Sequence, residues 1–306
     1  MQPRAVYNSI WAVTGLAFGM VSTIGAVYRV REAGLDPFEL VLVGTMLELS
    51  ILVFEVPTGV VADVVSRRLS IIVGLFIVGA GFVLEGSVPE LWAVLSAQLV
   101  WGFGYTFISG ANTAWLADEL GDDDLLAPAL LRGTQWYQAS LLAGIGLGAL
   151  LAVIDLQVPI VAGGAAFLAL GVVLALRMEE HGFAPAPRES RTTFAAFFRT
   201  FGEGVAVVRG RTVLLLLLGV AAFGGASSET VDRLWQVRFL DDFDIDAVIW
   251  FGALNGAWAV VGITGSEIVR RRGTGAASLL VILEVVRLGG LFLFALVGRL
   301  DLAVVG

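Results

Sequence analysis

The sequence contains no cysteine and one histidine among its 306 residues. Without cysteine, the chain can form neither a disulfide bond nor a thiolate metal site. A single histidine, His181, argues against a histidine-based metal site and against a histidine-dependent catalytic triad. No nucleotide-binding P-loop is present, which argues against an ATP-hydrolysing protein. We therefore expect no cofactor, no metal and no enzymatic activity.

Charged residues are also scarce. They make up 15% of the chain, whereas 58% of the residues are hydrophobic and the mean hydropathy is +0.88. Soluble domains average about 25% charged and about 45–50% apolar residues. This departure indicates an all-α membrane protein that crosses the bilayer several times. The 38 glycines suit the close approach of helices in lipid.

Long apolar runs of about 20 residues, the length that crosses a hydrocarbon core, recur along the chain. In the first half they predict six spans, at residues 8–28, 39–62, 69–86, 91–117, 133–154 and 156–176. An acidic stretch at 118–124 is expected to form a loop before the fifth span. We interpret residues 1–176 as an N-terminal bundle of six helices.

The composition changes at residues 177–211, where arginine and proline gather. We interpret this segment as a cytosolic linker. Phenylalanine and valine recur at helical spacing from 194 to 208, which predicts an amphipathic helix lying either on the membrane surface or on the protein's own cytosolic face. Residues 212–306 predict a partial C-terminal bundle, with spans at 212–233, 247–266 and 274–298 and the start of a tenth.

Arginine in the loops indicates the orientation, because cytoplasmic loops carry an excess of basic residues. Most arginines fall on the side that would be inside if the N-terminus were cytoplasmic: Arg4, Arg67, Arg68, Arg132, the linker arginines and those at 270–272. The other side holds Arg29, Arg31, Arg238 and Arg299. We expect a multi-pass protein of the inner (plasma) membrane with a cytoplasmic N-terminus.

A short charged hinge separates the second and third spans. Residues 55–70 read EVPTGVVADVVSRRLS, and their spacing is G-x-x-x-D-x-x-x-R-R: Gly59, Asp63, Arg67 and Arg68. The glycine and both arginines recur at the same spacing in Gly262, Arg270 and Arg271, with Ser266 in place of the carboxylate. A six-span unit, a basic linker and a second copy of the unit form a parallel repeat, as transporters often do.

The hinge resembles the cytosolic signature between spans two and three of the major facilitator superfamily, G-x-x-x-D-x-x-G-R-R, with Ser66 at the second glycine. Its lead-in, with Glu55, Pro57 and Thr58, resembles bacterial drug and tetracycline-type efflux members. The resemblance implies twelve spans in two six-helix bundles that alternate their access to the two sides of the membrane. About three spans are then expected beyond this chain, which we interpret as truncated.

Two positions depart from the patterns of proton-linked members. Gln98 stands where many of them have an arginine in the fourth span, ahead of Gly102 and Gly104. The fifth span carries Gly144, Gly146 and Gly148 but no proline within 133–154. Proton-driven antiport is therefore a weaker inference than membership of the superfamily.

The resemblance implies that the hinge is a conformational latch that bridges helix ends in one of two states. Charge-assisted pairs between arginine and carboxylate have the directional geometry for this role. The expected latch residues are Gly59, Asp63, Arg67, Arg68, Arg270, Arg271 and Asp118. The alternative is that the arginines only hold the loop inside the cell.

Ionisable groups inside spans are costly and usually serve function. We expect Glu48 to be a lone buried carboxylate near mid-bilayer that binds a proton or a cationic substrate, unless an arginine of another helix pairs with it. The further candidates for a proton or substrate site are Glu284, Arg287, Asn255 and Gln98. Glu284 and Arg287 could instead form a structural ion pair, since they are three residues apart. Glu55 is a possible gate.

Aromatic residues in the spans could line an apolar cavity or simply pack between helices. The candidates are Trp101, Tyr105, Trp136 and Trp258. Small-xxx-small pairs are expected at helix contacts: Gly15 with Gly19, Gly144 with Gly148, and Gly252 with Gly256.

The sequence thus favours a secondary transporter that exports amphipathic or drug-like small molecules in exchange for protons. A symporter that imports a small metabolite is the near alternative, and a membrane-embedded transferase is a distant one. The expected partners are a small-molecule substrate, a proton or other coupling ion, and the lipid bilayer. We expect a monomer with no nucleic-acid partner.

Overall fold

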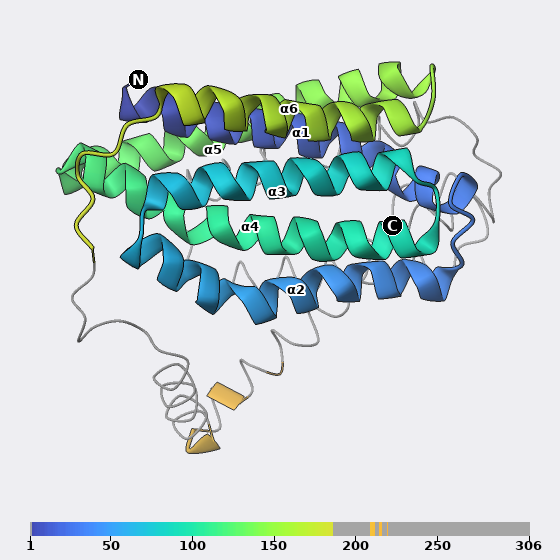
Figure 1. Cartoon of the computed structure of the whole chain (residues 1–306), viewed down its shortest axis with the longest axis horizontal. Helices are drawn as coiled ribbons and strands as arrows, with labels where there is room; N and C mark the ends of the chain where they lie inside the picture. The colour runs from blue at the N-terminus through green and yellow to red at the C-terminus, as the bar shows by residue number, and fades with distance from the viewer. Residues whose placement is uncertain (1, 186–208, 212–213, 216–218, 220–306) are drawn as a thin grey trace, which may run out of the picture. The chain divides into compact units, whose positions relative to one another are not determined.

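The computed structural model describes residues 2–185, 209–211, 214–215 and 219. The chain divides into two compact units, Met1–Leu234 and Trp235–Gly306, and every described residue lies in the first. Six long helices run side by side in this unit (Figure 1): α1 (Pro3–Arg31), α2 (Pro37–Val64), α3 (Arg67–Ser87), α4 (Leu91–Leu120), α5 (Asp123–Ala152) and α6 (Gln157–Arg177).

Short connections make successive helices alternate in direction. They range from the two residues Val65 and Ser66, between α2 and α3, to the five residues 32–36 between α1 and α2. One end of the bundle therefore holds the start of α1, α3 and α5 and the end of α2, α4 and α6. We call this the hinge end, because it contains the hinge at residues 55–70.

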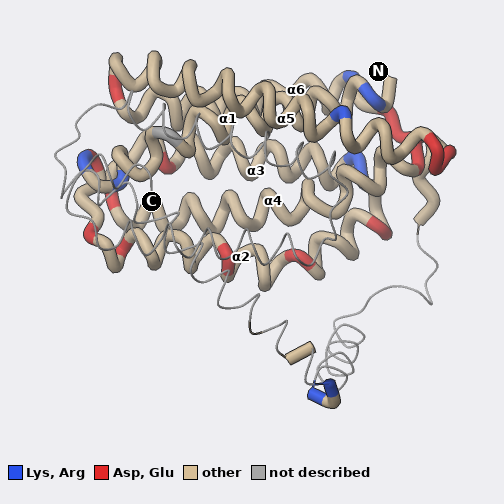
Figure 2. The backbone as a smooth tube through the Cα atoms, turned by 180° about the vertical axis from the view of Figure 1, so that it is seen from behind, with Lys and Arg blue, Asp and Glu red and all other residues tan. Residues whose placement is uncertain are grey.

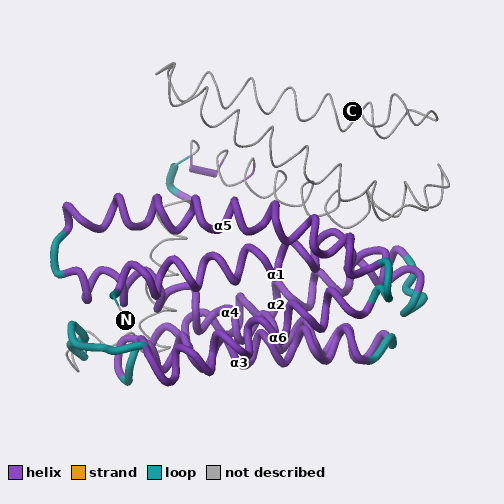
Figure 3. The backbone as a smooth tube through the Cα atoms, turned by 90° about the horizontal axis from the view of Figure 1, so that it is seen from above, coloured by secondary structure: helices purple, strands orange, loops and turns teal. Residues whose placement is uncertain are grey.

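The helices pack in a defined set of neighbours. α1 lies along α5 and α6, α3 lies along α4 and α6, and α2 lies mainly along α4 (Figure 3). Glycine allows the closest of these contacts. A Cβ atom on Gly15 would overlap the carbonyl oxygen of Tyr137, and one on Gly144 would overlap that of Leu16. The predicted small-residue contacts at Gly15–Gly19 and Gly144–Gly148 are confirmed, and Gly252–Gly256 lies outside the described residues.

Local sequence signals explain where several helices begin and end. α2 starts with a capping box: Asp36 Oδ1 accepts from the Glu39 backbone N–H at 2.8 Å, and Glu39 Oε2 accepts from the Asp36 N–H at 2.9 Å. Pro37 follows at the first helical position, where no N–H is needed. α4 ends at Gly121, whose φ of 59° is a left-handed conformation that favours glycine.

The apolar runs predicted five of the six helices closely, but the predicted start of the fifth span is wrong. α5 begins at Asp123, ten residues before the expected 133, so the acidic stretch is not one loop. Asp122 caps α5 by accepting the Asp124 N–H at 2.9 Å. Acidic residues in a first helical turn are favourable because they face the positive end of the helix dipole. A charged stretch therefore starts this helix.

The described helices have the dimensions of membrane spans. Five of them, all except α5, are long and apolar enough to cross a bilayer. α5 is 30 residues long, and a polar stretch at 134–138 lowers its hydropathy. Charged residues gather near the helix ends, with exceptions along α2 (Figure 2). The described unit is therefore a helical bundle of a multi-pass membrane protein.

Candidate functional site

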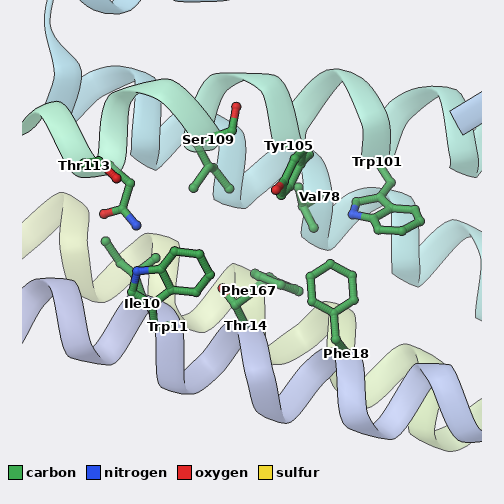
Figure 4. Close-up of a pocket in the computed structure, with 12 residues that line it drawn as sticks. Ile10, Trp11, Thr14, Phe18, Val78, Trp101, Tyr105, Ser109, Thr113 and Phe167 are labelled. Carbon is green, nitrogen blue, oxygen red and sulfur yellow. The ribbon is translucent and has the colours of Figure 1, made fainter. Parts of the chain in front are cut away.

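A cavity of about 220 Å³ lies inside the described bundle (Figure 4). Most of its wall comes from α1 and α4, with one residue each from α3 and α6. The lining residues are Ile10, Trp11, Thr14, Phe18, Val78, Trp101, Tyr105, Ile108, Ser109, Asn112, Thr113 and Phe167.

Helical periodicity places these side chains on common faces. Trp101, Tyr105, Ser109 and Thr113 recur every four residues along α4, and residues 10, 14 and 18 do the same along α1. Residues four apart lie on one face of a helix. The two helices therefore present one long stripe each to the cavity, as Figure 4 shows for the labelled side chains.

An aromatic cluster forms one end of the cavity. The ring of Phe18 lies 5.4 Å from that of Trp101 and 6.2 Å from that of Phe167, measured between centroids. Phe82 packs against all three rings at 5.4 to 5.9 Å. Edge-on and tilted contacts at such distances are favourable for aromatic rings. The position of the Trp101 indole is consequently fixed by packing.

Three buried polar atoms of the cavity lining have no hydrogen-bond partner. They are the indole N–H groups of Trp11 and Trp101 and the side-chain oxygen of Asn112. Asn112 is 3% exposed. Buried polar groups are nearly always paired, because leaving one unpaired costs free energy. The three atoms themselves have almost no accessible surface, so they lie within the wall of the cavity and not on its surface.

The described lining of the cavity contains no charged side chain. Among the expected aromatic residues, Trp101 and Tyr105 do line it. Trp136 does not, and its side chain is exposed on α5. Trp11 and Asn112 were not expected. The helical spacing of Trp11 with Phe18, and of Asn112 with Trp101 and Tyr105, is the sequence signal that could have found them.

Glu48 does not occupy the buried position expected from its depth. It is exposed on α2, and Glu55 further along the same helix is exposed as well. The physical reason is that α2 packs mainly on α4, so its other faces are left uncovered within the described bundle. Depth along a helix does not determine which face a residue occupies. The roles suggested for Glu48 and Glu55 stay predictions.

Gln98 lies in a buried polar cluster near the end of the bundle opposite the hinge end. Gln98 and Glu85 are both 0% exposed, and Arg29 is 8% exposed. Gln98 Nε2 donates to Glu85 Oε2 at 2.7 Å, and Arg29 Nε donates to Glu85 Oε1 at 2.8 Å. The Tyr28 hydroxyl donates to the Glu85 carbonyl oxygen at 2.6 Å. Three helices, α1, α3 and α4, are joined here.

Arg29 of α1 and Gln98 of α4 bind the same carboxylate, that of Glu85. Gln98 stands at the position of the family's arginine, and Arg29 of α1 supplies a guanidinium to the same cluster. Glu85 was missed in the sequence although it is the only charged residue inside the predicted span 69–86. A charge inside a span is the signal that could have found it.

At the hinge end, Arg67 brings together three of the expected latch residues. Its guanidinium forms an ion pair with Asp118 at the end of α4, and lies 3.6 Å from Asp63 Oδ1 at the end of α2. It also donates to the carbonyl oxygen of Ala114 at 2.9 Å. The ends of α2, α3 and α4 are thus held by one side chain.

Arg68 joins the hinge to the end of α6. Its guanidinium donates to the carbonyl oxygens of Met178 and Ala175, both at 2.7 Å. The last carbonyls of a helix lack partners within the helix and attract cations. Ser66, which replaces the glycine of the family pattern, caps α3 by accepting the Leu69 N–H at 2.9 Å and donates to Glu180 at 2.6 Å.

Residues 178–183, the first part of the expected linker, pack on the same end. Glu119 accepts the backbone N–H groups of His181 at 2.5 Å and Gly182 at 2.7 Å. The indole N–H of Trp115 donates to the Glu179 carbonyl oxygen at 3.2 Å. The Phe183 ring lies 5.9 Å from the Arg67 guanidinium. This segment connects the linker directly to the latch residues.

The remaining expected site residues are placed as follows. Gly59 has no atom of the described residues within 4 Å of where a Cβ would lie, so packing does not require glycine there. Arg270, Arg271, Asn255, Glu284, Arg287 and Trp258 lie outside the described residues. Among the described residues, no group of three or more histidine or acidic side chains could hold a metal ion.

Comparisons with known proteins agree with the helical architecture. The family model described as the Major Facilitator Superfamily matches residues 10–305. The chain is 24% identical over 267 residues to an uncharacterized MFS-type transporter, YxaM, of Bacillus subtilis, covering 85% of this chain and 65% of YxaM. It is 24% identical over 143 residues to an uncharacterized transporter, BU466, of Buchnera aphidicola, covering 47% of this chain and 36% of that protein.

Two solved transporters share the fold. The nucleoside transporter NupG superimposes with a TM-score of 0.71 at 14% identity, over 89% of this chain and 69% of NupG. A bacterial homologue of the human lysosomal transporter Spinster, inward-facing and unoccupied, gives a TM-score of 0.75 at 14% identity, over 98% of this chain and 70% of that one. The chain spans about two thirds or less of the length of its curated relatives. From the match of the family model to nearly all of its length, the chain belongs to the Major Facilitator Superfamily.

Proposed function

We propose that the protein is a secondary transporter that carries small organic molecules across the membrane by alternating access. The observation that carries this proposal is the cavity between α1 and α4, whose mostly apolar wall includes the hydroxyl-bearing residues Thr14, Ser109 and Thr113. Binding sites are concave, mostly apolar and furnished with a few polar groups.

The network at the hinge end supports the alternating part of this proposal. Arg67 and Arg68 connect the ends of α2, α3, α4 and α6 through ion pairs and hydrogen bonds. The Arg67 and Asp118 side chains are partly exposed, and ion pairs that water can reach are weak and can be broken and remade. A network of this kind biases two conformations without locking either, and a small bias is enough to shift their populations.

For direction and coupling, we propose export of amphipathic or drug-like molecules in exchange for protons. The resemblance of Glu55, Pro57, Thr58 and Gly59 to efflux members supports export. Glu48 is the proposed proton site, because an ionisable residue inside a membrane-spanning helix usually serves function. The proposed setting is the inner membrane, with a cytoplasmic N-terminus, and a monomer without cofactor or enzymatic activity.

Import of a small metabolite is the second candidate. The described lining of the cavity contains no charged side chain, which suits a neutral metabolite as well as a drug-like molecule. One of the solved proteins that shares the fold is named as a nucleoside transporter.

The test is transport by the full-length protein in sealed vesicles with an imposed pH gradient. Uptake of a panel of lipophilic cations, tetracycline-like compounds and nucleosides is measured for the wild type and for Glu48→Gln. We expect gradient-dependent uptake by the wild type and loss of the gradient dependence in Glu48→Gln. Glu32→Gln, at an exposed carboxylate just after α1, is the matched control and should transport like the wild type.

Equal gradient-dependent rates for wild type and Glu48→Gln would remove Glu48 from the mechanism. Transport of no compound would contradict the proposed function.

A further inference from the structure

A short segment after α6 lies across the hinge end of the bundle, where Figure 1 draws it in yellow. We call residues 178–183 the strap. They have no regular secondary structure, yet Met178 at their start is only 3% exposed. A connecting segment with few buried contacts opens easily. The strap instead binds the ends of two helices and is therefore part of the bundle.

Glu180 holds the strap to the start of α3. Its Oε1 accepts the Arg68 backbone N–H at 2.8 Å, and its Oε2 accepts the Ser66 hydroxyl at 2.6 Å. The first N–H groups of a helix have no partner within the helix, and they favour a negative charge. Ser66 stands where the family signature has a glycine, which has no side chain to bind Glu180. This departure from the signature therefore coincides with a contact to the strap.

Glu119 holds the strap to the last turn of α4. Its side chain is 7% exposed, and its Oε1 accepts the backbone N–H groups of His181 at 2.5 Å and Gly182 at 2.7 Å. Hydrogen bonds to an ionised carboxylate are stronger than those between neutral groups. A Cβ atom on Gly182 would overlap the carbonyl oxygen of Asp118. A larger residue at 182 would consequently push the strap away from α4.

The strap also covers the latch, by which we mean Arg67 with Asp63 and Asp118. The centre of the Phe183 ring lies 5.9 Å from the Arg67 guanidinium carbon, and Gly182 lies against the backbone of Asp118. The Arg67 and Asp118 side chains are only 18% and 28% exposed. Ion pairs contribute less as water reaches them. Release of the strap would expose this pair, so the docked strap stabilises it.

We propose that the strap is a conformational device of the linker. While docked, it stabilises the contacts of Arg67 with Asp63 and Asp118, and its release favours opening of the cavity at the hinge end. Because Glu180 binds α3 and Glu119 belongs to α4, the strap cannot stay bound to both if these helix ends separate. Strap and latch therefore stabilise each other, and such coupling is equal in both directions. The inference rests on the proposed function, since it concerns the switch between two openings.

Amide hydrogen exchange of the full-length protein in detergent micelles, followed by mass spectrometry, tests the coupling in both directions. Glu180→Ala changes the strap and is measured at the end of α4, in a peptide covering residues 112–121. Asp118→Asn changes the latch and is measured at residues 178–185. We expect each change to speed exchange at the other element about two- to twelvefold, the effect of losing one net hydrogen bond.

Two further variants separate strap docking from the loss of a charge. Gly182→Ala keeps every charge but displaces the strap from α4, so it should speed exchange at residues 112–121 as Glu180→Ala does. His181→Ala is the matched control. Its side chain is 75% exposed with Nδ1 3.6 Å from Glu119 Oε2, and such exposed pairs contribute little. The backbone N–H that Glu119 binds remains, so His181→Ala should exchange like the wild type.

The effect on access is measured with a cysteine introduced at Ser109, which lines the cavity. A membrane-impermeant maleimide is added to sealed vesicles of either orientation. Glu180→Ala and Gly182→Ala should raise the rate of labelling from the hinge-end side relative to the other side, whereas His181→Ala should not. A merely structural loss would change labelling from both sides alike.

Equal exchange at residues 112–121 in the wild type, Glu180→Ala and Gly182→Ala would overturn the proposal. Exchange of the wild-type strap as fast as that of an unstructured peptide would do the same. Coupled exchange with two-sided labelling in an unchanged ratio would overturn the role of the strap in opening. Coupled exchange with labelling from one side only in every variant would support the mutual stabilisation of strap and latch but contradict the proposed function.

Discussion

At the scale of single residues, the buried ion pair between Arg29 and Glu85 is a feature of the fold and not of the cavity. Arg29 Nη2 lies 2.6 Å from Glu85 Oε1, and neither residue lines the cavity. Buried pairs contribute little net stability, because desolvation of both charges offsets their attraction. Removing one partner is far more costly, since the other charge is left buried and unpaired.

A double-mutant cycle tests this difference. Glu85→Leu and Arg29→Met should each lower the free energy of unfolding by about 3–5 kcal/mol. The double variant should lose less free energy of unfolding than the more damaging of the two single variants, because it has no unpaired buried charge. The measurement is chemical unfolding in detergent micelles. Glu90→Gln, at an exposed carboxylate, should change the free energy by less than about 0.5 kcal/mol. Additive losses in the double variant would show that the two residues act independently.

At the scale of helices, the contact between α1 and α5 depends on glycines that a larger residue could replace only if the two backbones moved apart. Backbone carbonyl oxygens of one helix lie where Cβ atoms of the other would be, at Gly15, Gly19 and Gly144. In lipid, helices gain little from the hydrophobic effect on association, so close van der Waals packing matters more. This contact holds the Trp11 side of the cavity in place.

Two neighbouring glycines of α5 give a matched test of this contact. Gly144→Ala would force backbone apart and should destabilise the protein by about 1–3 kcal/mol. Gly146→Ala meets no described atom within 4 Å and should be neutral, or stabilising by up to about 1 kcal/mol through helix propensity. Thermal unfolding of both variants checks the opposite signs. If both variants melted alike, the close approach of α1 and α5 would not be needed.

The helices could be predicted from the sequence because length and apolarity suffice to identify a span. The start of α5 could not, because Asp122 to Asp124 read equally well as a loop and as the capped first turn of a helix. Of the cavity, Trp101 and Tyr105 were recognisable as aromatic residues in a glycine-rich span. Trp11 and Asn112 were not recognisable, because their place in the cavity wall depends on how α1 packs beside α4.

The sequence also could not predict in general which side chains of different helices form pairs. Arg67 and Asp118 are 51 residues apart, yet the position of Asp118 at the inner end of the fourth span was enough to place it among the expected latch residues. Arg29 and Glu85 are separated by a similar distance, and no motif links them. The face on which Glu48 lies depends on the neighbours of α2. Depth along the helix does not determine exposure.

At the scale of the whole molecule, the central claim is that the cavity between α1 and α4 opens alternately to the two sides of the membrane. We propose that one opening is controlled at the hinge end, because Arg67, Asp63 and Asp118 connect the helix ends there. Loss of a latch contact should shift the balance between the two openings without abolishing either. The sequence has no cysteine, so an introduced one reports without background.

The most direct test is accessibility of a single cysteine at Ser109, which lines the cavity on α4. A membrane-impermeant maleimide is added to sealed vesicles of either orientation that contain the full-length protein. We expect Ser109→Cys to be labelled from both sides, and the added change Asp118→Asn to alter the ratio of the two labelling rates. Labelling from one side only, with the same ratio when Asp118 is replaced, would contradict alternating access through this cavity.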